Sequence, residues 1–182
     1  AWIISDSESS VFFSDKRNYK LAHSLISKTV TEIITIQMEE GAFGQYTVQD
    51  IISQTASPAW LASGNDLAAL YYTGGTTGKP KGVMVSNQSM VVQTLNLIRD
   101  LNINTNTKVL HAPPLFHLAG AGVAYACAFA GASQIFLPDF SPKAYLTEIP
   151  RIQATLISLI PTMISEILFI IRFSNEINVL GR

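Results

Sequence analysis

The residues best equipped for chemistry lie in one short run, residues 72–82. Seven of its eleven residues are glycine or threonine, and two are lysine. Glycine allows positive φ and lets backbone N–H groups approach a ligand, and successive N–H groups in such a loop form a concave anion-binding nest. Threonine hydroxyls add hydrogen-bond donors and lysines add positive charge. This inventory suits a polyphosphate.

The spacing in this run narrows the kind of phosphate loop. Three residues separate Gly74 from Gly78, where a Walker A loop has four, and Lys79 is followed by Pro80 instead of Ser or Thr. The glycines do not fit the dinucleotide fingerprint GxGxxG either. Because Pro80 blocks direct passage into a helix and the flanks are rich in β-forming residues, we predict strand, loop, strand. The alternative, a plain Gly/Thr turn, leaves the lysines and the proline unexplained.

The string YYTGGTTGKPKGV, residues 71–83, resembles the phosphate-loop signature of the adenylate-forming (AMP-binding) superfamily. That group contains acyl-CoA synthetases, peptide-synthetase adenylation domains and luciferases. Residues 66–70 are similar to its lead-in strand, and residues 86–88 to the start of the helix that follows. The run PLFHLAG at 114–120 resembles a second landmark, where an aromatic–His pair lies beside the substrate pocket, and residues 161–163 resemble a further stretch. The resemblance covers roughly residues 1–170.

The resemblance implies an enzyme that activates a small carboxylic acid with ATP and Mg²⁺. The acid becomes an acyl-adenylate and passes to a thiol, which is coenzyme A in the acyl-CoA synthetases that PLFHLAG most resembles. Beside the acid pocket the resemblance places Phe116, His117 and Gly120. The residues that it implies at the ATP phosphates are Thr73, Gly74, Gly75, Thr76, Thr77, Gly78, Lys79 and Lys81. Three scattered histidines and a single cysteine predict no metal site.

Several family motifs have no counterpart in the chain. A Tyr-Gly-x-Thr-Glu run, an aspartate for the ribose, a hinge and a distal lysine are not found, and Tyr145–Glu148 lacks the glycine and one residue of spacing. We therefore expect residues 1–182 to be an internal part of an AMP-binding domain, without its N-terminal start, its later core motifs and its small C-terminal domain. The remainder of the same polypeptide would complete the site. Alternatives are a non-catalytic nucleotide-binding fragment, a peptide-synthetase adenylation domain, or a membrane-associated fragment.

The composition limits the other possibilities. With 48% hydrophobic residues, 14% charged residues and a net charge of −1, the chain can bury one core and has no electrostatic case for binding nucleic acid. Cys127, the single cysteine, excludes an internal disulfide framework and is predicted to be a buried thiol. Residues 115–137 are long enough to span a bilayer, yet they contain His117, Ser133 and Gln134. We predict a buried helix followed by a strand, no transmembrane segment, no signal peptide and a cytoplasmic location.

The elements that must position these residues alternate along the chain. We predict strands at 11–13, 30–36, on both sides of the phosphate loop, and at 108–111, 134–137 and 154–160. Helices are predicted at 16–27, at 48–54 after a Thr47 cap, at 87–101 after a Ser86 cap, at 115–130, and from Pro142 and Pro161. In the 87–101 helix the inner side would carry Met90, Val91, Leu95 and Ile98. This order predicts an α/β fold with a mostly parallel sheet flanked by helices. The resemblance makes it part of the large N-terminal domain of an adenylate-forming enzyme.

Overall fold

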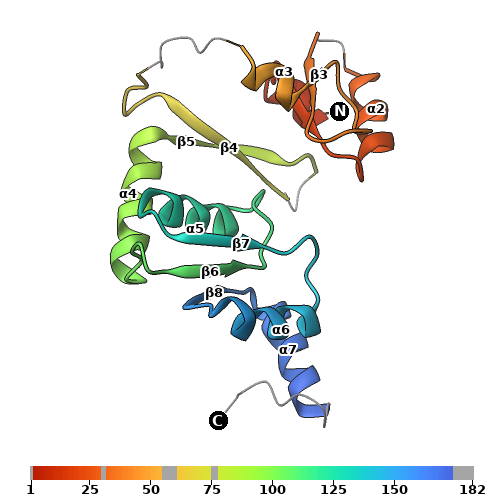
Figure 1. Cartoon of the computed structure of the whole chain (residues 1–182). Helices are drawn as coiled ribbons and strands as arrows, with labels where there is room; N and C mark the ends of the chain where they lie inside the picture. Colours follow the sequence, from red (N-terminus) through yellow and green to blue (C-terminus); the bar gives the residue numbers. More distant parts are fainter. Residues whose placement is uncertain (1, 30–31, 55–60, 75–77, 174–182) are drawn as a thin grey trace. The chain divides into compact units, whose positions relative to one another are not determined.

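The computed structural model describes residues 2–29, 32–54, 61–74 and 78–173 (Figure 1). The chain forms two compact units, one of residues 1–62 with 72–84 and one of residues 63–71 with 85–182. Each unit contains its own parallel sheet. A further two-stranded sheet, β4 (Leu67–Thr73) with β5 (Lys81–Ser86), has residues in both units. It confirms the strand–loop–strand prediction for the phosphate segment, residues 72–82.

The first unit holds a three-stranded sheet in the order β1 (Val11–Ser14), β2 (Ile34–Gln37), β3 (Tyr46–Thr47). Its strands are parallel, and α2 (Tyr19–Ile26) provides the crossover that two parallel neighbours require. The strand predicted at 30–36 begins only at Ile34, because Ile34 pairs with Val11, the first residue of β1. Residues 30–31 lie outside the described part of the chain.

Two short helices complete the first unit. The helix α1 (Trp2–Asp6) precedes β1 and was not predicted from the sequence. The helix α3 (Val48–Ile52) begins as predicted at Thr47, whose hydroxyl accepts a hydrogen bond from the Asp50 N–H at 3.0 Å. The Asp50 carboxylate in turn accepts from the Thr47 N–H at 2.7 Å, which completes a capping box.

The second unit is built around β6 (Lys108–His111), which lies between β7 (Ser133–Phe136) and β8 (Leu156–Ser158) in a parallel sheet. Successive side chains of a strand point to opposite faces of its sheet. Val109 and Leu110 are both fully buried, so both faces of β6 are covered. Near-continuous burial of this kind is typical of a central parallel strand.

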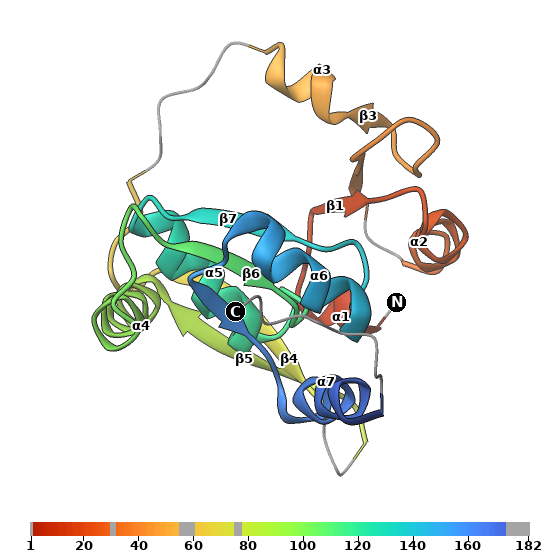
Figure 2. The ribbon, with the colours of Figure 1, turned by 60° about the horizontal axis from the view of Figure 1, so that its bottom comes forward.

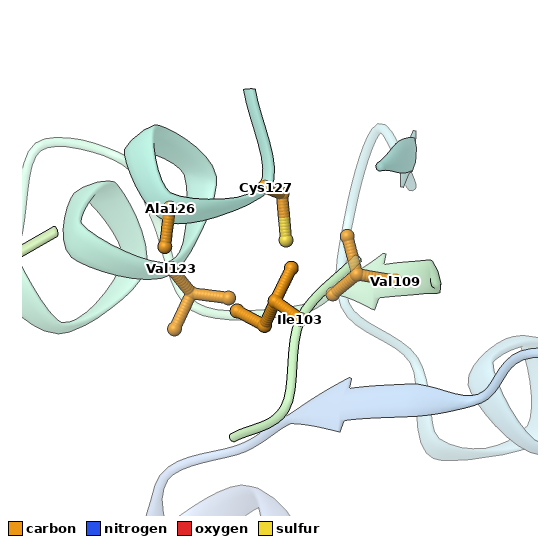
Figure 3. Close-up of a cluster of buried hydrophobic side chains, with 5 residues drawn as sticks. All are labelled: Ile103, Val109, Val123, Ala126 and Cys127. Carbon is orange, nitrogen blue, oxygen red and sulfur yellow. The ribbon is translucent and has the colours of Figure 1, made fainter. Parts of the chain in front are cut away.

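The two faces of β6 carry different clusters of buried side chains. Val109 packs with Ile103 and with three residues of α5 (Leu118–Phe129), namely Val123, Ala126 and Cys127 (Figure 3). Leu110 packs with Tyr145 and Leu146 of α6 (Pro142–Ile152) and with Ile167 of α7 (Pro161–Phe173). Figure 2 shows α5 and α6 on opposite sides of β6 and β7. The α/β fold with helices on both faces of a parallel sheet is thereby confirmed.

The helix α4 (Asn87–Asp100) packs on α5 and corrects one prediction. Its N-cap is Ser86, as predicted, with the Ser86 hydroxyl accepting from the Ser89 N–H at 3.2 Å. The prediction that Val91 and Leu95 lie on the inner side is wrong, because these side chains are 47% and 48% exposed. Ile98 does lie on the inner side, as predicted, together with Leu97 and the buried Thr94. On this side α4 lies close to Gly122 of α5, where a Cβ would lie 3.2 Å from Gln93 Nε2 and 3.3 Å from Leu97 Cδ1.

A helix followed by a strand is confirmed within residues 115–137, but the helix begins at Leu118 instead of Leu115, because residues 115–117 form the turn before it. The helix α5 is rich in buried small residues, and β7 follows it. Within the described ranges, no helix is both long enough and apolar enough to cross a membrane. Cys127 is buried, as predicted, and burial raises the pKa of its thiol. Tyr145–Glu148 lies inside α6, where the Tyr145 hydroxyl donates to the Leu110 carbonyl at 2.9 Å.

Candidate phosphate-binding site and acid-side turn

The phosphate segment connects β4 with β5, and its described polar side chains, Thr73, Lys79 and Lys81, are exposed. Thr73 ends β4, and its hydroxyl donates to the Lys81 carbonyl at 3.5 Å. Gly78 has φ +130°, in the region that side chains with a Cβ rarely adopt. Within the described residues, no atom lies within 4 Å of a Cβ built at Gly74 or Gly78. Such open space suits close approach of a ligand. Gly75, Thr76 and Thr77 lie outside the described residues.

The two lysines of the segment are exposed, and the structure distinguishes them. The Lys79 ammonium lies 5.4 Å from the centroid of the Trp2 ring, over its face. Lys81 is the first residue of β5, and its carbonyl oxygen accepts the hydrogen bond from the Thr73 hydroxyl. Nothing in the sequence indicates a contact between Trp2 and Lys79, because the two residues are far apart along the chain and share no motif.

Tyr72 is held in place at the start of the segment. Its hydroxyl donates to Asp6 Oδ2 at 2.7 Å, and this hydrogen bond raises the pKa of Tyr72. Its ring meets Trp2 edge to face, with the centroids 6.1 Å apart and the planes at 88°. A Cβ at Gly82 would lie 3.1 Å from the Tyr72 ring, so Gly82 permits the ring to lie across β5.

The second candidate region is the turn before α5. Phe116 is 74% exposed, and its ring centroid lies 4.6 Å from that of His117, with the planes at 51°. His117 is the N-cap residue of α5, and its carbonyl accepts from the Gly120 N–H at 3.0 Å. Phe116 and His117 therefore lie just before the first turn of α5, and the other end of this helix is packed in the core.

Gly120 has a packing role that the sequence did not reveal. It is buried, and a Cβ there would lie 2.6 Å from the Pro114 carbonyl oxygen and 2.8 Å from that of Pro113. Only glycine lets α5 come so close to this turn. Gly120 thus fixes the turn that carries Phe116 and His117.

His111 ends β6 beside this turn and is 3% exposed. Its ring stacks on Phe136 of β7, with the centroids 4.5 Å apart, and its Nε2 lies 3.0 Å from Gln134 Oε1. Its Nδ1 is buried and has no hydrogen-bond partner among the described residues. Burial lowers the pKa of His111, so the neutral form is favoured. In the sequence, the apolar residues before His111 indicate a strand that ends at this histidine.

Tyr71, next to the phosphate segment, contacts α5 of its own unit. Its hydroxyl is hydrogen-bonded to that of Tyr125, and burial, followed by this contact, raises the pKa of Tyr71 to about 12. Across the described ranges, no three His, Cys, Asp or Glu side chains gather closely enough to bind a metal ion. Cationic, hydroxyl and backbone groups thus characterise the phosphate segment, whereas aromatic and imidazole groups characterise the turn.

Taken together, the parallel sheets, the helices that cover them and the order of the elements define an α/β protein. A family model described as AMP-binding enzyme matches residues 1–178. The chain belongs to this family, which confirms the resemblance carried by residues 71–83.

Similar proteins are CoA ligases. The chain is 27% identical over 159 residues to 2-succinylbenzoate–CoA ligase of Bacillus licheniformis, covering 84% of this chain and 33% of that protein. It is 27% identical over 175 residues to the mitochondrial malonate–CoA ligase ACSF3 of Homo sapiens, covering 92% of this chain and 29% of that protein. The chain spans about a fifth to a third of the length of the curated relatives it matches.

Solved structures agree on the fold. ATP-bound MatB from Rhodopseudomonas palustris superposes with a TM-score of 0.74 at 28% identity, covering 92% of this chain and 33% of that one. A long-chain-fatty-acid-CoA ligase from Archaeoglobus fulgidus superposes with a TM-score of 0.80 at 21% identity, covering 93% of this chain and 34% of that one. The second likeness concerns the fold alone.

Proposed function

We propose that the chain is a segment of an ATP-dependent acid–thiol ligase, which activates a carboxylate as an acyl-adenylate and transfers the acyl group to coenzyme A. The observation that carries the proposal is the Gly/Thr/Lys connection between β4 and β5. Family membership and the CoA ligases among the relatives support it.

The proposed reaction has two steps. A carboxylate oxygen of the acid attacks the α-phosphorus of ATP, the bond from that phosphorus to the bridging oxygen breaks, and pyrophosphate leaves. The thiol of coenzyme A, on losing its proton, then attacks the acyl carbon, and AMP leaves. In the first step negative charge grows on the departing pyrophosphate, so fixed donors and cations there stabilise the transition state.

The phosphate segment has groups suited to that task. Thr73, Gly74, Gly78, Lys79 and Lys81, with three further residues of the segment, would hold the β- and γ-phosphates. Backbone N–H groups, hydroxyls and ammonium groups can do so without reacting themselves. Mg²⁺ would arrive bound to ATP, and we expect its carboxylate ligand from the remainder of the polypeptide. The further phosphate residues proposed are Gly75, Thr76 and Thr77.

The turn before α5 is proposed to face the acid. Phe116 and His117 are exposed and adjacent, which suits contact with an acyl or aryl group, and Gly120 fixes the turn that carries them. Coenzyme A is preferred to a carrier protein as the thiol because the relatives described above are CoA ligases. Fatty and aryl acids are the substrates to test first.

We further propose that residues 1–182 are one part of a larger AMP-binding domain, as the coverage of the relatives suggests. The adenine pocket and the catalytic lysine would come from the rest of the protein, so the 182-residue chain alone would be inactive. The predicted cytoplasmic location belongs to this proposal. Imaging of the tagged complete protein would test it against the mitochondrial location named for the human relative.

ATP–pyrophosphate exchange tests the proposal. The complete protein should catalyse exchange that depends on a carboxylic acid from a panel of fatty, aryl and dicarboxylic acids, and adding coenzyme A should yield the thioester and AMP. The 182-residue chain should give no exchange. ATP binding without exchange would instead indicate a non-catalytic nucleotide-binding protein. Exchange with acyl transfer only to a carrier protein would indicate a peptide-synthetase adenylation domain.

A further inference from the structure

Four side chains connect α1 to both flanks of the phosphate segment. Trp2 and Asp6 lie on α1, Tyr72 lies just before the segment's glycines, and Lys79 lies just after Gly78. We call these four residues the brace. All of them belong to the first unit, although 66 residues separate Asp6 from Tyr72.

The Tyr72 side of the brace is held by three independent contacts. The Asp6 carboxylate accepts from the Tyr72 hydroxyl at 2.7 Å, and charge-assisted hydrogen bonds are stronger than neutral ones. The Trp2 ring meets the Tyr72 ring in the preferred edge-to-face arrangement. Gly82 also lies against the ring, where a Cβ would approach Tyr72 Cζ to 3.1 Å, tighter than most contacts. Tyr72 is thus fixed at the point where β4 enters the segment.

The Lys79 side of the brace is fixed by backbone and ring together. Pro80 restricts the preceding residue to extended conformations, so the direction of the Lys79 side chain is limited. The Lys79 ammonium lies 5.4 Å from the centroid of Trp2, within the range of cation–π attraction. The same indole therefore contacts both flanks, Tyr72 through an edge-to-face contact and Lys79 through its face.

We propose that α1 braces the phosphate segment, with Trp2 and Asp6 as positioning residues for ATP. This inference rests on the proposed function of the segment. Trp2 positions Lys79, one of the two lysines proposed to hold the phosphates, and the Asp6–Tyr72 hydrogen bond fixes the opposite flank. Because both flanks of a glycine-rich segment are held before ATP binds, less conformational freedom is lost on binding.

The first experiment detects the brace without ATP. The chain has two tryptophans, so Trp60→Phe leaves Trp2 as the only indole emitter. With Lys79 over the ring, iodide should quench Trp2 fluorescence more effectively than caesium does. Lys79→Met should lower iodide quenching and raise caesium quenching, whereas Lys143→Met, on α6 of the other unit, should change neither. Unchanged quenching in Lys79→Met would overturn the Lys79 side of the brace.

The second experiment measures Mg-ATP affinity by calorimetry in the complete protein. Trp2→Ala and Asp6→Ala should each weaken Mg-ATP binding by about two- to five-fold, which is the factor that corresponds to one exposed cation–π contact or hydrogen bond. Asp6→Asn keeps an acceptor for the Tyr72 hydroxyl and Trp2→Phe keeps a ring, so both should bind Mg-ATP within about two-fold of the parent protein. The KM of the acid should not change in any of these variants.

Two comparisons separate failure of the brace from failure of the proposed function. If Lys81→Ala weakens Mg-ATP binding while Trp2→Ala and Asp6→Ala do not, the brace has no positioning role and the inference is overturned. If Lys81→Ala changes neither the Mg-ATP affinity nor kcat, the phosphate assignment fails. The brace is then judged by hydrogen exchange of amides in 72–74 and 78–84 without ATP, which Trp2→Ala should accelerate if the brace exists. Equal loss of acid and ATP affinity in Trp2→Ala would indicate general destabilisation and would also overturn it.

Discussion

Gly120→Ala should destabilise the start of α5 and disturb the turn that carries Phe116 and His117. The added methyl group would lie 2.6 Å from the Pro114 carbonyl oxygen, about 0.8 Å inside the 3.4 Å at which ordinary contact begins. A backbone oxygen cannot rotate away as a side chain can, so the turn or the helix must shift. Overpacking of this kind costs about 1–3 kcal/mol. Alanine recovers about 0.5–1 kcal/mol of helix propensity, which leaves a net loss of up to about 2.5 kcal/mol.

Gly122→Ala is the matched control in the same helix. Its methyl group would meet only the ends of two side chains, Gln93 Nε2 at 3.2 Å and Leu97 Cδ1 at 3.3 Å, and both can move. The gain in helix propensity should offset this mild crowding, so the free energy of local opening should stay within about 0.5 kcal/mol of the parent value.

Hydrogen exchange of the α5 amides measures that free energy directly. Gly120→Ala should lower it by at least about 1 kcal/mol relative to Gly122→Ala. In the complete protein, Gly120→Ala should also change the KM of the acid and leave that of ATP unchanged. If the α5 amides of Gly120→Ala are protected as well as those of Gly122→Ala, the close approach to Pro114 does not constrain the helix, and the reasoning is refuted.

Four further predictions follow from burial and capping. Because burial lowers the pKa of His111 below its ordinary 6.5, the unfolded chain binds a proton there that the folded chain does not. The free energy of unfolding should therefore fall as pH drops below about 6.5, and His111→Gln should flatten this dependence in urea titrations. Ser86→Ala removes the α4 cap and should cost about 1 kcal/mol in the same titrations, so an unchanged midpoint would exclude a role for the cap. The buried Cys127 thiol should react with a thiol reagent only after unfolding, and rapid reaction in native buffer would contradict its burial. The 182-residue chain should elute as oligomers, because α7 exposes 63% of Phe169 and 67% of Phe173, and a monomer with a cooperative melt would show that it is self-sufficient.

Segments with a capping or proline signal were predictable from local sequence. Ser86, Thr47 and the Ser141–Pro142 pair mark helix starts that the structure reproduces, because these residues satisfy or tolerate unpaired N–H groups wherever they occur. Strand lengths were less predictable, because a strand extends only as far as its neighbour. The predicted strand at 154–160 shortens to Leu156–Ser158, paired with residues 109–111 of β6.

The inner side of α4 shows what periodicity alone cannot provide. Val91 and Leu95 share a helical stripe, yet α4 is rotated so that Leu97 and Ile98 pack on the buried residues of α5. Such a rotation depends on the partner helix. The hydrophobic periodicity of α4 alone therefore does not predict this rotation.

The candidate site likewise has features that could be predicted from the sequence and features that could not. The composition of the phosphate segment, with Lys81 among its residues, could be identified from the string itself. The contacts of Trp2 and Asp6 with Tyr72 could not be predicted, because they join residues far apart in sequence that carry no shared motif. The burial of His111 was indicated only in part: the apolar residues before it predict the strand, but a histidine at the end of a strand can face either solvent or the core.

The central claim is that the segment between β4 and β5 acts on the ATP phosphates while the turn before α5 acts on the acid. Steady-state kinetics of adenylation by the complete protein, with Lys81→Ala and His117→Ala compared side by side, tests it most directly. Loss of one charge-assisted donor to the departing pyrophosphate should cost about 2–4 kcal/mol. Lys81→Ala should therefore lower kcat about 30- to 1000-fold with little change in the KM of the acid, and His117→Ala should change which acids are accepted. If Lys81→Ala alters only the KM of the acid, the assignment of this segment to phosphate is wrong.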